Sequence, residues 1–371
     1  MRRALCLLLA LLGLPLCACT RKAAEAPEME NAGSMELVYA ENFRVDYAPG
    51  GAALLTLGDR ERFLLLPDGA ETPAEAAELP VIHIPVERVY LASSSAADLF
   101  LQCGALDHLR FSSTDAQSWQ IGELRDAIER GSLLYAGKYS APDYELLLEE
   151  GCDLVVENTM ILHRPETREK LEALGFPVLL EYSSYEPQPL GRVEWIKLYG
   201  LLTGTLPEAE AFFDRQLAAF RALKGAEKSG RTVAFFHIAA NGAVVVRRQA
   251  DYVTRMIELA GGETAITELL ESDSALSTAS IQMESFYAQA HDADVLIYNS
   301  TVGGEIERMD QLLALSPLLA DFKAVQNGEV WCTELSMFQR SSAAAGMITD
   351  IHEILGDAPK EENLQYLHRV R

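Results

Sequence analysis

The stretch TLPEAEAFFDRQLAAFRAL, residues 205–223, carries the strongest helix signal in the chain and lies near its middle. Thr205 and Glu208 have the spacing of a capping box, and Pro207 falls in the first turn, where a backbone N–H is not needed. Apolar residues recur at three- and four-residue steps and predict one buried stripe: Ala209, Phe212, Phe213, Leu217, Phe220 and Leu223. At ~1.5 Å per residue this helix is roughly 27 Å long, so it could join two lobes or be one crossover helix of a single sheet.

Strand-like runs alternate with short helices on both sides of this stretch. The composition, 49% hydrophobic and 23% charged, suits two globular domains. The predicted strands before the helix are residues 86–93, 108–115, 133–139, 152–159 and 176–185, and the helices between them are 97–106, 122–131, 142–151 and 165–175. This alternation predicts a mostly parallel sheet covered by helices. Residues 36–66, with Pro-Gly-Gly and Gly-Asp turns, predict a meander at the edge of this lobe.

Two segments on opposite sides of the helix share one pattern. In PDYELLLEEGCDLVVENTM, residues 142–160, and IQMESFYAQAHDADVLIYNST, residues 281–301, a Glu on a short helix precedes an acidic residue that opens an apolar strand. The pattern predicts two similar lobes and makes residues 205–223 the bridge between them. We therefore expect an α/β fold of two Rossmann-like lobes with mostly parallel sheets, joined by a single long helix, with a ligand cleft between them. The expected units are 36–188, 189–224 for the helical linker, 225–356, and a tail at 357–371.

The first residues read as a targeting segment. Arg2 and Arg3 precede an apolar run too short to span a bilayer, and the run ends at Leu16-Cys17-Ala18-Cys19. That tetrad resembles the bacterial lipobox, so we expect a signal peptide at 1–18, a lipid on Cys19 and a flexible tether at 19–35. A plain secretory signal is the alternative. Because no other run reaches transmembrane length, we expect a protein anchored by lipid on the extracytoplasmic face of the membrane.

Charge and cysteine content exclude several classes of protein. With 31 basic and 55 acidic residues the net charge is −24, which repels nucleic acid and anionic lipid. Beyond the leader, only Cys103, Cys152 and Cys332 remain, too few for a disulfide framework, and we expect them to be buried.

Six strings in order resemble the solute-binding proteins of ABC importers for ferric siderophores, haem and cobalamin. They are RVYLASSSAADLFLQCGALDHL, the 142–159 segment, EKLEALGFPVLL, the linking helix, MIELAGGETAI and DFKAVQNGEVWC. The resemblance implies a monomer with a shallow cleft for one metal complex, which it delivers to a permease dimer driven by cytoplasmic ATPase subunits. In that family one acidic residue on each lobe meets arginines of the permease. Glu145 matches this position, and Glu284 matches it with a two-residue insertion before its strand.

The chemistry of the strand ends selects the expected ligand-binding residues, since ligands of parallel sheets gather there. These residues are Ser94, Ser95, Asp115, Trp119, Lys138, Tyr139, Asn158, Met160, Tyr182 and Tyr185 in the first lobe, and His237, Arg247, Asn299 and Phe338 in the second. Lys138 and Arg247 would suit an anionic ferric siderophore walled by aromatic rings. A lone histidine such as His237 is more often a core residue, but with Met160 or a tyrosine it could ligate haem. We expect a ferric siderophore as ligand, with cobalamin or haem next, and no resident cofactor.

Bare metal ions and catalysis are not expected. The seven histidines are far apart in sequence with no paired spacing, which disfavours a transition-metal site. No G-x-S-x-G elbow, phosphate-binding G-x-x-x-x-G-K-[ST] loop or H-E-x-x-H motif occurs. We therefore expect a binding protein rather than an enzyme, with an exported hydrolase or a lipoprotein sensor as the alternatives.

Overall fold

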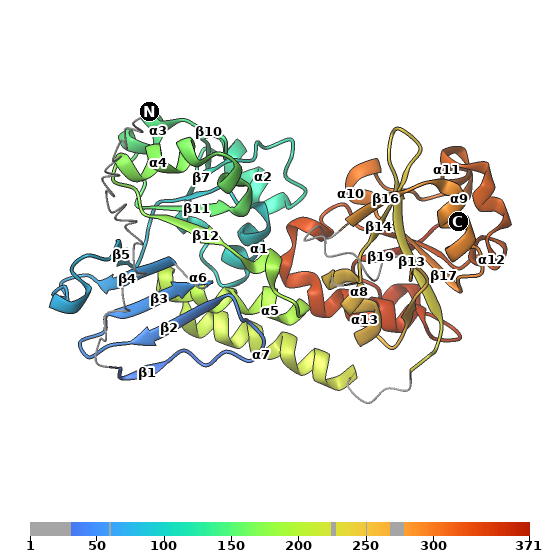
Figure 1. Ribbon diagram of the computed structural model, residues 1–371, viewed down its shortest axis with the longest axis horizontal. Coiled ribbons are helices and arrows are strands. Elements are labelled where there is room, and N and C mark those ends of the chain that lie inside the picture. Colours follow the sequence, from blue (N-terminus) through green and yellow to red (C-terminus); the bar gives the residue numbers. More distant parts are fainter. Residues whose placement is uncertain (1–30, 59–60, 224–227, 250, 268–277) are drawn as a thin grey trace, which may run out of the picture.

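The computed structural model describes residues 31–371 except 59–60, 224–227, 250 and 268–277. The expected signal peptide, Cys19 and most of the expected tether therefore lie outside the described residues. Figure 1 shows two lobes side by side, with helix α7 (Leu206–Leu223) running along one side beneath both. Within the described part of the chain, no helix combines the length and apolarity needed to cross a membrane.

The chain begins with a five-stranded sheet of the order β1-β2-β3-β4-β5. Its first four strands are antiparallel neighbours, as the predicted meander requires, and β5 is parallel to β4. The Pro-Gly-Gly turn between β2 and β3 places Gly50 and Gly51 at φ 85° and 89°, where a side chain would be strained. The strands are β1 (Gly33–Ser34), β2 (Phe43–Tyr47), β3 (Ala53–Leu57), β4 (Glu61–Pro67) and β5 (Val81–Ile84), with the turn η1 (Ala74–Ala76) before β5.

The first α/β lobe contains a parallel sheet of the order β12-β11-β6-β7-β8. Its strands are β6 (Val89–Leu91), β7 (Leu109–Ser112), β8 (Leu134–Tyr135), β11 (Leu154–Asn158) and β12 (Val178–Glu181). Its helices are α1 (Ser94–Gln102), α2 (Gly122–Glu129), α3 (Tyr144–Glu149) and α4 (Pro165–Ala173). A hairpin, β9 (Gly137–Lys138) and β10 (Ala141–Pro142), and the turns η2 (Leu106–His108), η3 (Thr159–His163) and η4 (Ser183–Tyr185) complete it. The strands and helices predicted from the apolar periodicity are all present.

The second lobe contains a mixed sheet of the order β16-β14-β13-β17-β18-β19, with β15 beside β13. Strands β13 (Thr232–Ile238), β15 (Glu263–Thr264), β17 (Val295–Tyr298) and β18 (Val330–Thr333) are parallel. Strands β14 (Val244–Arg247), β16 (Thr278–Ile281) and β19 (Leu367–Arg369) are antiparallel to their neighbours. Residues 357–371, expected to be a tail, instead supply β19, whose three residues were too few to show a strand pattern.

Helices cover the sheet of the second lobe. They are α8 (Tyr252–Leu259), α9 (Met283–Ala290), α10 (Ser300–Gly303), α11 (Met309–Leu315), α12 (Lys323–Gln326) and α13 (Ala344–Ile354). Short turns connect them: η5 (Pro317–Asp321), η6 (Met337–Gln339), η7 (Ser341–Ala343) and η8 (Glu361–Asn363). Both lobes are thus α/β, and the expected fold class of two lobes with mostly parallel sheets is confirmed.

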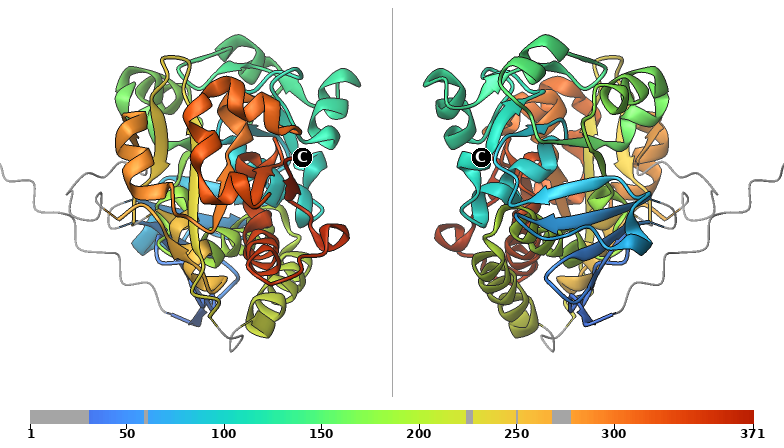
Figure 2. Two further views of the ribbon diagram at one scale, coloured as in Figure 1. Left: turned by 90° about the vertical axis from the view of Figure 1, so that its right-hand side faces the viewer. Right: turned by 90° about the vertical axis from the view of Figure 1, so that its left-hand side faces the viewer.

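Three helices lead from the first lobe to the second: α5 (Pro189–Glu194), α6 (Ile196–Thr203) and α7. The predicted apolar stripe of α7 is buried at Ala209, Phe212, Phe213, Leu217 and Phe220. Helix α6 lies close against α7, since a Cβ added at Gly200 would come within 2.6 Å of the Ala209 Cβ. The helix continues beneath α13 of the second lobe, and both views in Figure 2 show it at the base. Residues 205–223 therefore link the two lobes and are not a crossover helix within one sheet.

Two buried glutamates attach the start of the chain to this linker. The Glu194 carboxylate accepts hydrogen bonds from the backbone N–H groups of residues 38–40 at 2.7 to 2.9 Å and from Lys197 at 2.8 Å. The Glu186 carboxylate accepts from the N–H groups of residues 41 and 42 and from the Trp195 indole. Because buried carboxylates need such donors, these contacts hold the first sheet against α5 and α6.

The predicted sequence repeat has matching structural roles in the two lobes. Asp153 at the start of β11 accepts from the N–H groups that lead into β6, and Asp294 at the start of β17 accepts from the Thr232 N–H at the start of β13. At the other end of each strand, Asn158 caps the Met160 N–H and Asn299 caps the Thr301 N–H. The same residue types thus close the same turns in both lobes.

The linker predicts limited motion between the lobes. Helix α7 has no glycine along its length, and a packed helix without a hinge favours small rigid-body closure over wide bending. We expect small-angle scattering profiles recorded without and with a bound ligand to superimpose closely. A large decrease in the radius of gyration on binding would contradict this prediction.

Candidate functional site

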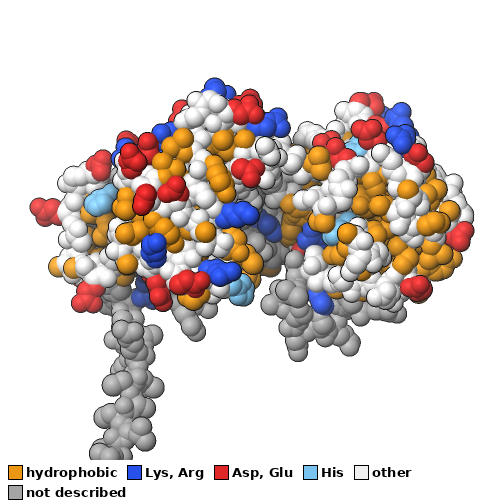
Figure 3. All heavy atoms as spheres, turned by 90° about the horizontal axis from the view of Figure 1, so that it is seen from above, with side chains coloured by type: hydrophobic (Ala, Val, Ile, Leu, Met, Phe, Trp, Pro, Cys, Tyr) orange, Lys and Arg blue, Asp and Glu red, His pale blue; other side chains and the backbone are white. Residues whose placement is uncertain are grey.

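The two lobes face each other across a hollow on the side opposite α7. Figure 3 looks into this hollow and shows Lys and Arg side chains on both of its walls. The lobes also touch directly: Gln339 of the second lobe accepts from the Gln120 N–H at 2.8 Å and donates to the Ser118 carbonyl oxygen at 2.9 Å. Buried Asp98 on α1 accepts from the Ser342 N–H at 2.9 Å. These bonds fix the segment from η6 to η7 against the first lobe.

A pocket lies where linker helix α5 meets α8 and the segment from η6 to α13. It is open to solvent, and the space within it that a water-sized sphere can occupy is about 20 Å³, which is far below the ~300–1,000 Å³ typical of small-ligand sites. It is lined by Arg192, Tyr252, Met256, Met337, Phe338, Arg340, Ser341, Ala343, Ala344 and Met347. The pocket therefore has methionine and aromatic walls with two arginines.

Cations and aromatic rings alternate through this pocket. The Arg192 guanidinium carbon lies 3.9 Å from the centre of the Tyr252 ring, and that ring meets Phe338 edge to face at 6.4 Å. The Arg247 guanidinium carbon, which is outside the pocket lining, lies 4.6 Å from the centre of the Phe338 ring. Stacking of this kind holds guanidinium groups in place while their N–H donors remain usable. We call Arg192, Tyr252, Phe338, Arg247 and Arg340 the arginine–aromatic cluster.

Acidic side chains only partly balance the charge of this cluster. Arg247 lies 3.5 Å from Asp251 and Arg340 lies 3.6 Å from Asp98. Burial raises the pKa of Asp251, an effect that the Arg247 cation opposes. No carboxylate of a described residue lies within ion-pair distance of Arg192, whose interaction is with the Tyr252 ring. The cluster therefore keeps a positive charge with which an anionic ligand could pair.

His237 stands next to the cluster on the same face of the sheet. It pairs with Val245 on β14, two residues from Arg247, and is 8% exposed. Burial lowers its pKa, and the nearby Arg247 cation lowers it further. The imidazole is therefore held neutral, the form in which histidine ligates a metal.

Of the residues predicted to bind ligand, the structure brings His237, Arg247 and Phe338 together. In the first lobe the Tyr182 and Tyr185 rings lie 6.2 Å apart, with Tyr185 57% exposed. The remaining surface positions are spread over strand ends and turns. Ser94, Ser95 and Tyr139 are partly exposed, and Lys138, Asp115 and Met160 are exposed. The Ser118 N–H and hydroxyl hold the pKa of Asp115 below its usual range, with a small contribution from Lys138.

Three predicted ligand residues have structural roles instead. Trp119 is 1% exposed, and its indole N–H donates to the Ser112 hydroxyl, so its ring has no face open to a ligand in this structure. The Asn158 and Asn299 side chains cap the turns that follow their strands. Polar residues at a strand end can contact a ligand or cap the helix that follows. Sequence alone does not distinguish these two roles.

The sequence patterns do not identify Arg192, Tyr252 and Arg340 as candidate site residues. Arg192 lies on a helix and Arg340 in a turn, where charged side chains are usually solvated. Tyr252 opens α8 directly after its cap Asp251. What the three share is a place in the lining of the pocket, which is visible only in the tertiary structure.

The two acidic residues predicted to meet a permease occupy equivalent places. Glu145 is in the first turn of α3 and Glu284 in the first turn of α9, each two residues after its helix cap, and both are exposed. Helix α9 is two residues longer than α3, which accounts for the insertion seen in the sequence. Figure 1 shows α3 and α9 on different lobes.

The predicted burial of the three cysteines is confirmed. Cys103, Cys152 and Cys332 are free and buried. Burial raises the pKa of Cys152 and of Cys332 to about 12, so both are protonated and unreactive near neutral pH.

Comparison with known proteins agrees with this geometry. The sequence profile described as periplasmic binding protein matches residues 116–334, more than half of the chain. An uncharacterised lipoprotein of Methanocaldococcus jannaschii is 23% identical over 351 residues, covering 90% of this chain and 86% of that protein. The periplasmic haem-binding protein HutB of Vibrio cholerae superposes with a TM-score of 0.57 at 19% identity, covering 70% of this chain and 96% of that one.

A second solved structure is similar over a comparable share of the chain. The ABC-type Fe³⁺-hydroxamate transport protein of Saccharomonospora viridis superposes with a TM-score of 0.54 at 20% identity, covering 73% of this chain and 94% of that one. The chain belongs to the periplasmic binding protein family. As a member of this family, it is a binding protein rather than an enzyme.

Proposed function

We propose that this protein captures an anionic ferric siderophore in the cleft between its lobes and delivers it to an ABC importer. The arginine–aromatic cluster carries the proposal. Ferric siderophores are bulky and often anionic, so guanidinium groups held by aromatic rings suit their charged rim. Because the pocket has only about 20 Å³ of space for a water-sized sphere, it would receive one group at the ligand's rim, and the wider hollow above would hold the rest.

Haem is the second candidate because of His237. Its imidazole is held neutral and makes no hydrogen bond with another described residue, which leaves a ring nitrogen able to ligate iron. The neighbouring arginines would suit the propionates of haem. The similarity to a haem-binding protein supports this alternative, and similarity to a vitamin B12-binding protein of Vibrio cholerae keeps cobalamin as a third.

A lipid on Cys19 completes the proposal. The Leu16-Cys17-Ala18-Cys19 tetrad and the lipoprotein relatives support it. The anchor would keep the binding protein near its permease and raise its effective concentration there.

A thermal-shift panel tests the ligand class. Ferric hydroxamates, ferric catecholates, ferric carboxylates, haem and cobalamin would each be added to the purified protein. A ligand at one hundred times its Kd raises the free energy of unfolding by about 2.7 kcal/mol. We expect an anionic ferric complex to give the largest rise and its iron-free form a smaller one. A rise with haem or cobalamin alone would replace the siderophore assignment.

Glu145 and Glu284 are predicted to dock the protein on arginines of the permease. We expect Glu145→Lys with Glu284→Lys to lower uptake in cells several-fold, because like charges then face each other, while Kd for the ligand stays the same. Glu149→Lys is the matched control, since Glu149 is an exposed residue of α3 outside the docking pair. Unchanged uptake by the double variant at equal expression would refute the docking role.

A further inference from the structure

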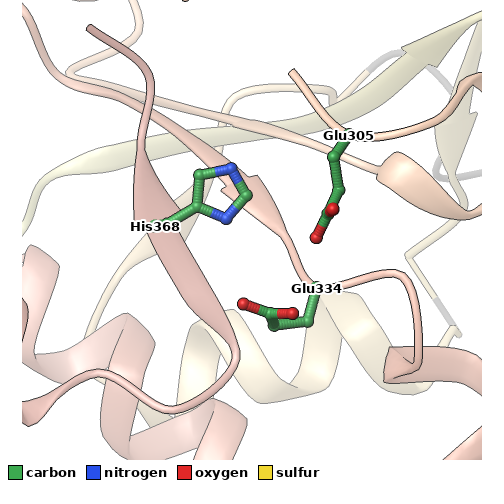
Figure 4. A group of neighbouring side chains, drawn as sticks. All are labelled: Glu305, Glu334 and His368. Atoms are coloured by element: carbon green, nitrogen blue, oxygen red, sulfur yellow. The ribbon is translucent and has the colours of Figure 1, made fainter. Parts of the chain in front are cut away.

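Three metal-ligating side chains meet at one edge of the second lobe, outside the arginine–aromatic cluster. Glu305, Glu334 and His368 each offer a ligand atom, and these atoms lie within 4.8 Å of one another. Glu305 lies in the loop after α10, Glu334 directly follows β18, and His368 is on β19. Figure 4 shows the three side chains directed toward a common space. We call them the Glu–Glu–His group.

The backbone orients His368 for this role. Its Nε2 lies 3.2 Å from the Ile306 carbonyl oxygen. A carbonyl oxygen only accepts, so this contact places the ring proton on Nε2 and leaves the lone pair on Nδ1. Figure 4 shows Nδ1 on the side of the ring that faces Glu334 and Glu305. Metal-ligating histidines usually have their other ring nitrogen held by such an acceptor.

The two carboxylates lack a cation of their own. Among the described residues, neither the Glu305 nor the Glu334 side chain forms an ion pair or a hydrogen bond. Two carboxylates this close repel each other, and a bound cation would remove that repulsion. Elsewhere in the lobe acidic side chains do have such partners, as Asp294 has in Lys323 at 2.7 Å.

We propose that the Glu–Glu–His group binds a divalent transition-metal ion. One imidazole nitrogen with two carboxylate oxygens suits Zn²⁺ or Mn²⁺, whereas Mg²⁺ and Ca²⁺ prefer oxygen ligands alone. Two ligands each ~2.1 Å from a zinc ion are about 3.4 Å apart in tetrahedral geometry, so the group would close by about 1.4 Å or less from its present separation of up to 4.8 Å. The remaining coordination positions would hold water.

Binding at this site would cross-link three segments that are distant in sequence. The loop after α10, the end of β18 and the C-terminal strand β19 would share one ion. The site does not depend on the proposed function, since none of its residues belongs to the arginine–aromatic cluster.

Titration calorimetry tests this proposal. The purified protein, with any affinity tag removed and metal stripped by a chelator, is titrated with ZnCl₂ and with MnCl₂. We expect saturable binding of at least one of these ions that excess Mg²⁺ does not prevent. Glu305→Gln with Glu334→Gln, which keeps the side-chain shape, should weaken that binding by at least ~10-fold, because substitutions around metal sites typically cost ~10 to 100-fold.

The control is Glu307→Gln, which removes one exposed charge from the same loop outside the group. It should bind the ion as the wild type does. Circular dichroism checks that all variants are folded, and His368→Gln provides a second removal of a ligand. The proposal is overturned if the wild type binds neither ion saturably, or if the Gln variants bind it as tightly as the wild type. The siderophore panel is scored separately and does not depend on either result.

Discussion

Arg192→Met is expected to weaken binding of an anionic ferric complex by about 10- to 100-fold. Arg192 lines the pocket, is held 3.9 Å from the centre of the Tyr252 ring, and forms no ion pair with a described residue, although its charge acts on the nearby Asp251. Its charge is therefore available to a ligand, and truncating one side of a desolvated charge pair typically costs ~2 kcal/mol or more. Calorimetry or fluorescence quenching with the complex identified by the panel measures the change in Kd.

The matched control for this change is Arg215→Met. Arg215 also lies over an aromatic ring, that of Phe212 at 5.5 Å, but on the linking helix, away from the pocket. Both variants lose one positive charge and one stacked guanidinium. We expect the control to keep the wild-type Kd. Equal weakening in the two variants would mean that net charge alone, rather than the arginine–aromatic cluster, attracts the ligand.

Glu157→Gln is expected to stabilise the protein by a few kcal/mol at pH 8 to 9. Glu157 lies on β11 with 0% exposure, and neither carboxylate oxygen has a hydrogen-bond partner. Burial raises its pKa from 4.5 to about 8. The cost of ionising this buried carboxyl at high pH is removed when Gln replaces it.

The direction of the pH dependence follows from this raised pKa. Below about pH 4.5 both folded and unfolded chains hold the proton, so the full contribution to stability is present. As pH rises from 4.5 to about 8, the unfolded chain releases the proton while the folded chain keeps it, and stability falls by about 1.4 kcal/mol per unit. Above about 8 the loss is complete.

Urea denaturation at several pH values measures this difference. The midpoints of wild type and Glu157→Gln should lie close together at pH 4 and separate as pH rises to 8. Glu149→Gln, an exposed position on α3, controls for the general loss of a carboxylate. A constant difference between Glu157→Gln and wild type at all pH values would show that Glu157 titrates normally in the folded protein.

Much of the fold follows from local sequence patterns. The apolar period and cap signals of residues 205–223 predict α7 to within one residue of its observed start at Leu206. The repeated Glu-to-strand segments predict two lobes. In the structure, Asp153 and Asp294 accept backbone hydrogen bonds at the starts of equivalent strands. These signals are reliable because they lie within one helix, one strand or one turn.

Other features depend on contacts between distant residues. The bonds from Glu194 to residues 38–40 span more than 150 positions, and no local pattern predicts them. Strand β19 is three residues long and becomes a strand only by pairing with β18. Tertiary pairing therefore decides such elements.

The candidate site likewise contains some residues that local sequence predicts and others that only the tertiary structure brings together. His237, Arg247 and Phe338 were predicted from their places at strand ends and loops, and they do lie together. The sequence around Arg192 and Arg340 is typical of solvated charged residues. The fold brings both into the lining of one pocket. The histidine spacing disfavoured a bare metal site, yet two glutamates reach His368 from other segments, and this grouping is visible only in three dimensions.

The central claim is that the arginine–aromatic cluster binds an anionic ferric complex between the lobes. Calorimetric titration of the wild type with the complex that gives the largest thermal shift, at low and at high salt, tests it most directly. We expect one ligand per chain and a Kd that rises with salt, because screening weakens the contribution of the arginines. Binding of unchanged affinity at both salt concentrations, or no binding of any ferric complex, would contradict it.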